Sequence, residues 1–154
     1  MLRQDINDAL KTAMKAKDVR ATSTLRLILA ALKDRDIAAR TDGGGDDGIG
    51  DDALLEMLQK MIKQRHDSIE QYKKGNRPDL VRQEEEEIEI IKTFLPKQMS
   101  DDEVAAAIDA TVSDIGAGSI KDMGKTMAAL KERYAGKMDF AKAAQRVKTR
   151  LSAH

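Results

Sequence analysis

The sequence predicts an all-α protein in which an N-terminal antiparallel helical bundle is followed by a small three-helix C-terminal module. Apolar residues recur at the three- and four-residue spacing of helices over almost the whole chain of 154 residues. No segment shows the apolar–polar alternation of a strand, and helix-capping residues precede several of the apolar stripes. We therefore expect about four helices before Pro96 and three short helices after it.

The first two predicted helices carry apolar stripes over residues 2–14 and 25–37, and Asp18 is the expected N-cap of the second. The stripe then stops at residues 41–52, which read TDGGGDDGIGDD. Five Gly and five Asp in this segment disfavour a helix, because Gly loses much backbone entropy on folding and Asp prefers caps and turns. We expect a flexible loop here.

The third predicted helix covers residues 54–72 and ends at Gly75, which suits a left-handed C-cap. Pro78 stands where a fourth helix begins, a position at which its missing N–H costs little. That helix extends to Leu95 and contains the acidic run 84–89.

A domain boundary is expected at Pro96, because proline disfavours a helix both at its own position and at the residue before it. The predicted domains are therefore residues 1–95 and 96–154. Ser100 and Glu103 then have the spacing of a capping box, and Met99 can pack against Val104.

The C-terminal module divides into three apolar stripes that are separated by glycine-containing turns. The first stripe covers residues 104–115 and ends at Gly116. Ser119 is the expected cap of a second helix, which bears Met123, and Asp139 is the expected cap of the last.

Composition excludes several classes of function. The chain has no Cys, so disulfides, iron–sulfur clusters and thiol catalysis are excluded. No apolar run approaches the roughly 20 residues of a membrane helix, and the N-terminus does not resemble a signal or transit peptide. We therefore expect a cytoplasmic protein that has no membrane partner.

No catalytic residue, metal site or cofactor site is predicted. Neither His lies three residues after a Glu, as a ferritin-like metal site requires, and the aspartates of residues 41–52 do not match a calcium-binding loop. The acidic run is interpreted as a solvated face, within which Glu84 and Glu87 are expected to pair with basic residues of a neighbouring helix. His66 is interpreted as a surface residue.

The formal net charge is zero, but charge is unevenly distributed along the chain. Residues 1–95 carry a net charge of −2 and residues 96–118 carry −4, whereas residues 119–154 have nine basic and three acidic side chains, or +6. A basic block of this kind is compatible with contacts to phosphate groups. From charge alone, a set of Lys and Arg that only keeps short helices soluble is equally compatible.

Two Gly–Lys corners favour the phosphate-binding interpretation. Gly124–Lys125 lies at a predicted helix start and Gly136–Lys137 lies in a turn, where glycine permits close approach and helix N–H groups can bind anions. The candidate nucleic-acid-binding residues are Lys121, Gly124, Lys125, Lys131, Gly136, Lys137, Lys142 and Arg146.

At these residues the chain resembles the GatB/YqeY domain family, and specifically its free-standing YqeY-like proteins. The matching motifs are Asp122-Met123-Gly124-Lys125-Thr126-Met127, Gly136-Lys137-Met138-Asp139 with Val147, and Phe94-Leu95-Pro96-Lys97-Gln98-Met99-Ser100. Upstream, segments 6–18 and 63–68 fit as well. One departure is Phe140, which follows Asp139 where the family usually has Gly.

The resemblance implies an N-terminal bundle and a C-terminal module similar to the tail of the B subunit of glutamine-dependent aminoacyl-tRNA amidotransferase. That tail helps to recognise tRNA, so the resemblance implies tRNA or other RNA as the partner. Two alternatives stay open. One is a protein-interaction module that docks on an amidotransferase or synthetase complex. The other is a carbon–nitrogen ligase with glutamine as amide donor, although no serine shows a recognisable catalytic spacing.

Overall fold

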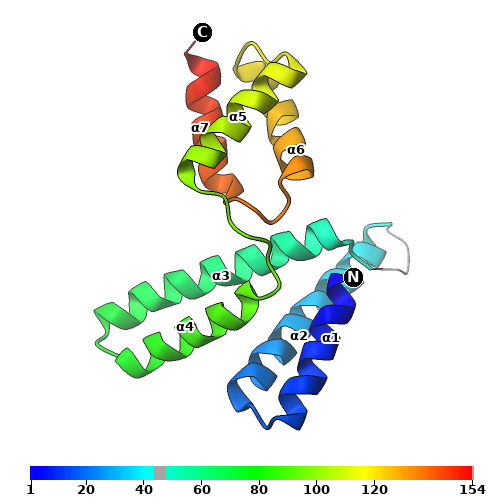
Figure 1. Cartoon of the computed structure of the whole chain (residues 1–154), viewed down its shortest axis with the longest axis vertical. Coiled ribbons are helices and arrows are strands. Elements are labelled where there is room, and N and C mark those ends of the chain that lie inside the picture. The colour runs from blue at the N-terminus through cyan, green and yellow to red at the C-terminus, as the bar shows by residue number, and fades with distance from the viewer. Residues whose placement is uncertain (44–47, 154) are drawn as a thin grey trace. The chain divides into compact units, whose positions relative to one another are not determined.

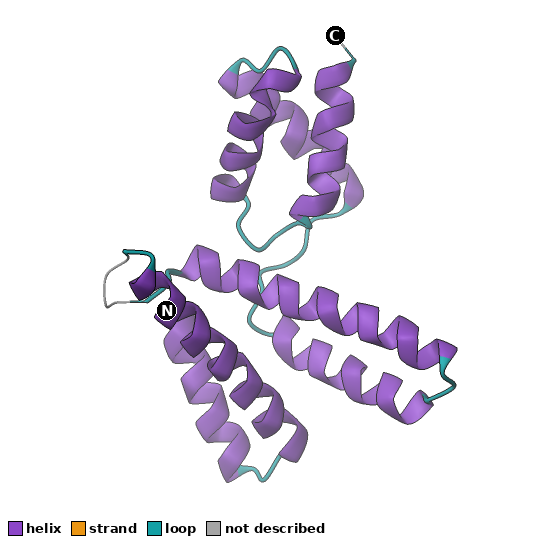
Figure 2. Ribbon diagram, turned by 180° about the vertical axis from the view of Figure 1, so that it is seen from behind, coloured by secondary structure: helices purple, strands orange, loops and turns teal. Residues whose placement is uncertain are grey.

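The structure, a computed structural model, describes residues 1–43 and 48–153 (Figure 1). These residues form seven α-helices and one short 3₁₀ helix, and no strand is found among them (Figure 2). The predicted all-α fold class is thereby confirmed. The chain divides into two compact parts, Met1–Leu95 and Pro96–His154, which we call the N-terminal unit and the C-terminal unit.

The N-terminal unit is built from two helical hairpins. Its helices are α1 (Leu2–Lys15), α2 (Val19–Thr41), α3 (Asp51–Lys74) and α4 (Pro78–Lys92). Helix α1 packs along α2, α3 packs along α4, and α2 also packs against α4. The buried residues of the core come from all four helices: Ile6, Ala13, Leu25, Ile28, Leu32, Leu54, Met57, Leu58, Met61 and Ile91.

The ends of these helices follow the expected local chemistry, with one exception. The Asp18 carboxylate accepts a hydrogen bond from the backbone N–H of Ala21 at 3.0 Å, and Pro78 occupies the start of α4, as predicted. The left-handed cap predicted at Gly75 is wrong, because Gly75 has φ −84° and Asn76 takes the left-handed conformation with φ +55°. Asn tolerates that conformation better than most residues, so the turn does not need a glycine there.

The connection between α2 and α3 is shorter than the predicted loop, because Thr41 ends α2 while Asp51 and Asp52 begin α3. Acidic residues suit this helix start, since they complement the positive end of the helix dipole. The expectation of flexibility falls largely on residues 44–47, which lie outside the described residues.

The described end of this connection is held by an ion pair. Arg3 donates to the two carboxylate oxygens of Asp36 at 2.7 and 3.1 Å, and Asp36 also accepts from the backbone N–H of Ile49 at 2.9 Å. Gly48 lies against this pair with φ +80°, and a Cβ at that position would lie 2.5 Å from an oxygen of Asp36. Glycine is therefore required where the chain passes the ion pair.

The C-terminal unit is a three-helix module of α5 (Asp101–Ile115), α6 (Met123–Arg133) and α7 (Phe140–Ser152), with the 3₁₀ helix η1 (Ile120–Asp122) before α6. Each of the three α-helices contacts the other two. They enclose a core of their own, formed by Ala107, Ile108, Val112, Leu130, Met138, Ala143, Val147 and Leu151. Phe140, the departure from the family pattern, packs against this core.

Capping residues define the helix boundaries of the C-terminal unit. Ser100 and Glu103 form the predicted capping box, and Gly116 takes the left-handed conformation with φ +68°. Ser119 is a cap, but of η1 rather than of the longer helix expected from the sequence. The reason is local: the Asp122 carboxylate accepts from the backbone N–H of Ser119 and closes a single 3₁₀ turn before α6 begins.

Candidate nucleic-acid interface

The three arginines of α6 and α7 are held by carboxylates of α5. All three pairs lie on the surface, with N–O distances of 2.8, 3.5 and 3.1 Å; they are Arg133–Asp114, Arg146–Asp101 and Arg150–Asp109. Arg146 also donates a hydrogen bond to the carbonyl oxygen of Asp101 at 3.0 Å. Exposed pairs of this kind add little to stability, but they neutralise both partners and fix the direction of the arginine side chains.

Three further carboxylates of this unit are used as helix caps. Glu103 accepts from the backbone N–H of Ser100 at 3.1 Å, and Asp122 accepts from that of Gly118 at 2.8 Å. Asp139 caps α7, where it accepts from the first backbone N–H groups of that helix. Most of the negative charge of the C-terminal unit is therefore directed toward its own arginines and backbone.

The lysines of the same region are in a different position. Six of them are exposed and have no ion pair within the described part of the chain: Lys121, Lys125, Lys131, Lys137, Lys142 and Lys148. We call these the free lysines. Five of them were candidates from sequence, whereas Lys148 was not, because it lies in mid-helix away from either Gly–Lys corner.

The two glycines of the candidate site differ in their surroundings. Gly124 lies on the open surface of α6, where an added Cβ would meet nothing within 4 Å. Gly136 is buried in the turn after α6 with φ +73°, and its carbonyl oxygen accepts from the side-chain amide of Gln98 at 2.7 Å. Gly124 is thus accessible to a ligand, whereas Gly136 has a structural role in the turn.

The two Gly–Lys corners do not form one groove. Lys125 lies in the first turn of α6, and Lys137 follows the end of that helix (Figure 1). Eleven residues of α-helix span about 16 Å. The two lysines can therefore contact separate phosphate groups of an extended ligand, but not a single phosphate group.

The N-terminus of α7 is already occupied by its own cap. The Asp139 carboxylate accepts from the backbone N–H groups of Ala141 at 2.9 Å and of Lys142 at 3.3 Å. These groups are satisfied within the chain, so the ammonium groups of the free lysines are the donors left for an anion at this end of the unit.

The caps give the C-terminal unit a predicted pH dependence. Backbone hydrogen bonds lower the pKa of Asp122, chiefly from Gly118 and then from Ser119, and a hydrogen bond from the Ser100 backbone lowers the pKa of Glu103. Both groups therefore favour the folded state above their ordinary pKa values of 3.8 and 4.5, and this contribution is lost as the pH falls through the lowered folded values.

We expect the melting temperature of this unit to fall as the pH is lowered from about 5 to about 3, and Asp122→Asn to reduce that slope. Circular dichroism melts at several pH values measure the slope, and NMR titration of the Asp122 carboxyl carbon measures the pKa. An Asp122 carboxyl that titrates at or above 3.8 would contradict the expectation.

The N-terminal unit holds a second group of charges, which is structural. Glu87 is buried and accepts from the Arg65 side chain at 3.1 Å, with Arg20 3.9 Å away. The predicted pairing is confirmed for Glu87. Glu84 has no ion pair among the described residues, and its pKa is raised by burial and then by the neighbouring charge of Glu87. His66 is exposed, as expected.

Comparison with known proteins places this arrangement in a family. A sequence model described as "Yqey-like protein" matches residues 3–151. The chain belongs to the YqeY-like family. The match extends over both units and covers every candidate residue of the C-terminal unit.

Relatives of this YqeY-like chain occur in yeasts under the name "Altered inheritance of mitochondria protein 41, mitochondrial". The protein of Lachancea thermotolerans is 44% identical over 106 residues, which are 69% of this chain and 53% of the relative. That of Vanderwaltozyma polyspora is 40% identical over 86 residues, or 56% and 44%. That of Eremothecium gossypii is 34% identical over 116 residues, or 74% and 58%.

The YqeY-like chain thus spans about half the length of the curated relatives that it matches. The names of these relatives describe them as mitochondrial, and the cytoplasmic location of this chain stays a prediction. Among the described helices, none has the length and apolar character needed to cross a membrane.

Proposed function

We propose that this YqeY-like protein is a non-catalytic RNA-binding accessory protein that contacts tRNA through the free lysines of its C-terminal unit. The observation that carries the proposal is the separation of charge within that unit. Its arginines are neutralised by α5, whereas six exposed lysines on and around α6 and α7 are left without ion pairs among the described residues.

Lysine ammonium groups suit the phosphate backbone, since each neutralised phosphate releases condensed counterions. Base stacking is not supported by this unit, because its two aromatic residues, Tyr134 and Phe140, pack against the core. The proposed contact therefore positions the protein on the RNA backbone without reading bases. The resemblance of this unit to the tail of the amidotransferase B subunit supports tRNA as the RNA class.

The test measures binding of bulk tRNA to the full chain by fluorescence anisotropy over a range of salt concentrations. The variant is Lys125→Ala with Lys137→Ala and Lys142→Ala. We expect weaker binding at low salt and a salt dependence reduced by about two to three phosphate contacts, that is by roughly 0.7–0.9 per contact in the log–log slope.

A matched control removes three exposed lysines of the N-terminal unit: Lys11, Lys15 and Lys33. This variant loses the same charge, so it is expected to keep the salt dependence of the unsubstituted chain. Absence of tRNA binding at low salt, or equal slopes for the two triple variants, would overturn the proposal.

A further inference from the structure

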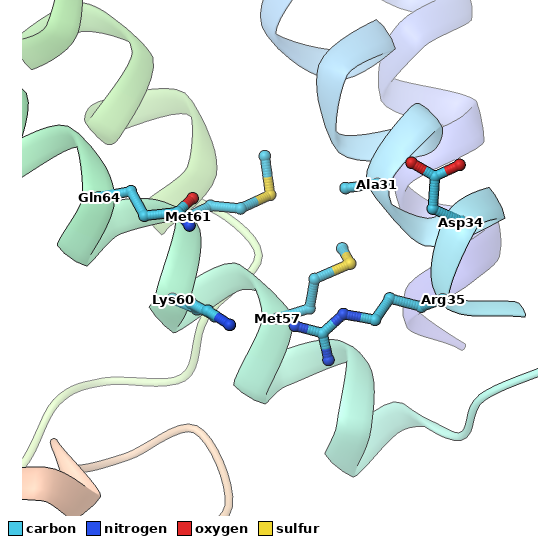
Figure 3. Close-up of a pocket in the computed structure, with 7 residues that line it drawn as sticks. All are labelled: Ala31, Asp34, Arg35, Met57, Lys60, Met61 and Gln64. Atoms are coloured by element: carbon cyan, nitrogen blue, oxygen red, sulfur yellow. The ribbon is translucent and has the colours of Figure 1, made fainter. Parts of the chain in front are cut away.

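The N-terminal unit contains a pocket between α2 and α3 that neither its core nor the proposed RNA contact uses. Its volume is about 280 Å³ (Figure 3). It is lined by three residues of α2 and four of α3: Ala31, Asp34, Arg35, Met57, Lys60, Met61 and Gln64. It lies where the two helical hairpins meet, since α2 and α3 belong to different hairpins.

The floor of the pocket is apolar and adaptable. Met57 and Met61 come from α3, four residues apart and so on one face of the helix, and Ala31 faces them from α2 (Figure 3). Methionine side chains are flexible and polarizable, and they accommodate apolar partners of different shape. Leu27 extends this surface by one turn of α2, because it lies four residues before Ala31 and is 49% exposed.

The rim of the pocket is cationic. Arg35 from α2 and Lys60 from α3 extend toward one another across the space between the helices (Figure 3). Neither has an ion pair within the described residues. The Asp34 carboxylate points away from the Arg35 guanidinium, so it does not neutralise that group (Figure 3).

We propose that this pocket is a docking site for an acidic amphipathic helix of a partner protein. One apolar side chain of that helix enters between Met57 and Met61, and flanking carboxylates pair with Arg35 and Lys60. An apolar floor between two cations is complementary to the apolar and acidic residues that adjoin on such a helix. The inference concerns the N-terminal unit and is independent of the proposed RNA contact.

The probe for the test is a fluorescein-labelled synthetic helix of about 14 residues, with Leu at helical spacing and Glu beside it. It is titrated into the full chain and followed by anisotropy. One comparison peptide has the same composition in scrambled order, and another has Lys in place of Glu. We expect saturable binding of the acidic helix only, weakened about tenfold by Arg35→Glu with Lys60→Glu.

A matched pair of substitutions controls for net charge. Lys33 and Lys63 lie on the same two helices, are exposed and do not line the pocket, so Lys33→Glu with Lys63→Glu is expected to leave peptide binding unchanged. The site itself is read from ¹³C-methyl methionine NMR of the full chain. The signals of Met57 and Met61, assigned with Leu substitutions, are expected to shift, and that of Met138 in the other core is not.

Several outcomes would overturn this docking site. Equal binding of the scrambled or basic peptide would remove the charge complementarity, and equal weakening by the control pair would remove the role of Arg35 and Lys60. Unmoved Met57 and Met61 signals would place the peptide elsewhere. Loss of tRNA binding in the Arg35→Glu with Lys60→Glu variant would assign these cations to RNA instead.

Discussion

Replacing Glu87 by Leu is expected to destabilise the N-terminal unit by about 3 kcal/mol, because it leaves a buried cation without its carboxylate. The side chains of Arg65 and Glu87 are only 13% and 8% exposed, and they join α3 to α4 through a 3.1 Å contact. Arg65 also donates to the carbonyl oxygen of Met61, but that contact supplies no negative charge.

The unfolding free energy from urea denaturation measures this cost. Adding Arg65→Met to Glu87→Leu is expected to recover most of the loss, since an apolar pair of similar volume replaces a buried ion pair at little cost. The matched control is Glu86→Leu. Glu86 is 48% exposed and pairs with Arg20 at the surface, so its removal is expected to cost about 0–1 kcal/mol. Equal costs at residues 86 and 87, or no recovery in the double variant, would contradict this assignment.

Truncation of the two cores is expected to have separate effects of similar size. Leu58 and Leu130 are each 0% exposed, one in each core. Leu58→Ala is expected to cost the N-terminal unit about 3 kcal/mol, and Leu130→Ala to cost the C-terminal unit about the same, because each leaves a cavity among close-packed neighbours. No residue is shared between the two cores, so each substitution should lower only the transition of its own unit.

The chain contains its own reporters for this experiment. It has no Trp and two Tyr, with Tyr72 in α3 and Tyr134 at the end of α6. Tyrosine fluorescence in a Tyr72→Phe background follows the C-terminal unit, and in a Tyr134→Phe background it follows the N-terminal unit. If Leu58→Ala and Leu130→Ala each lowered both transitions by the same amount, the two cores would be unfolding as one cooperative body.

The helices could be predicted from sequence because their signals are local. Apolar spacing and capping residues such as Asp18, Ser100 and Pro78 act within one or two turns, so the sequence pattern and the structure agree there. The errors arose where two local solutions compete. Asn76 takes the left-handed step expected of Gly75, and Asp122 closes a 3₁₀ turn where Ser119 was expected to begin a longer helix.

The candidate interface was harder to predict because it depends on contacts between distant segments. Arg146 was nominated as a ligand-binding residue, and the structure shows it engaged by Asp101, 45 residues earlier. Gly136 was expected to admit a ligand, but its carbonyl oxygen is bound by Gln98. Charge counting located the basic block, whereas only the folded arrangement separates neutralised arginines from free lysines.

This separation follows side-chain type, and that determines how selective the surface can be. A guanidinium group presents donors in a rigid planar fork that fixes the angle of its partner, whereas an ammonium group acts as a compact point charge that accepts approach from many directions. In the C-terminal unit the forks are turned inward to α5, and only point charges face solvent. Such a surface accommodates a polyanion in several registers, so discrimination among ligands has to come from their overall shape.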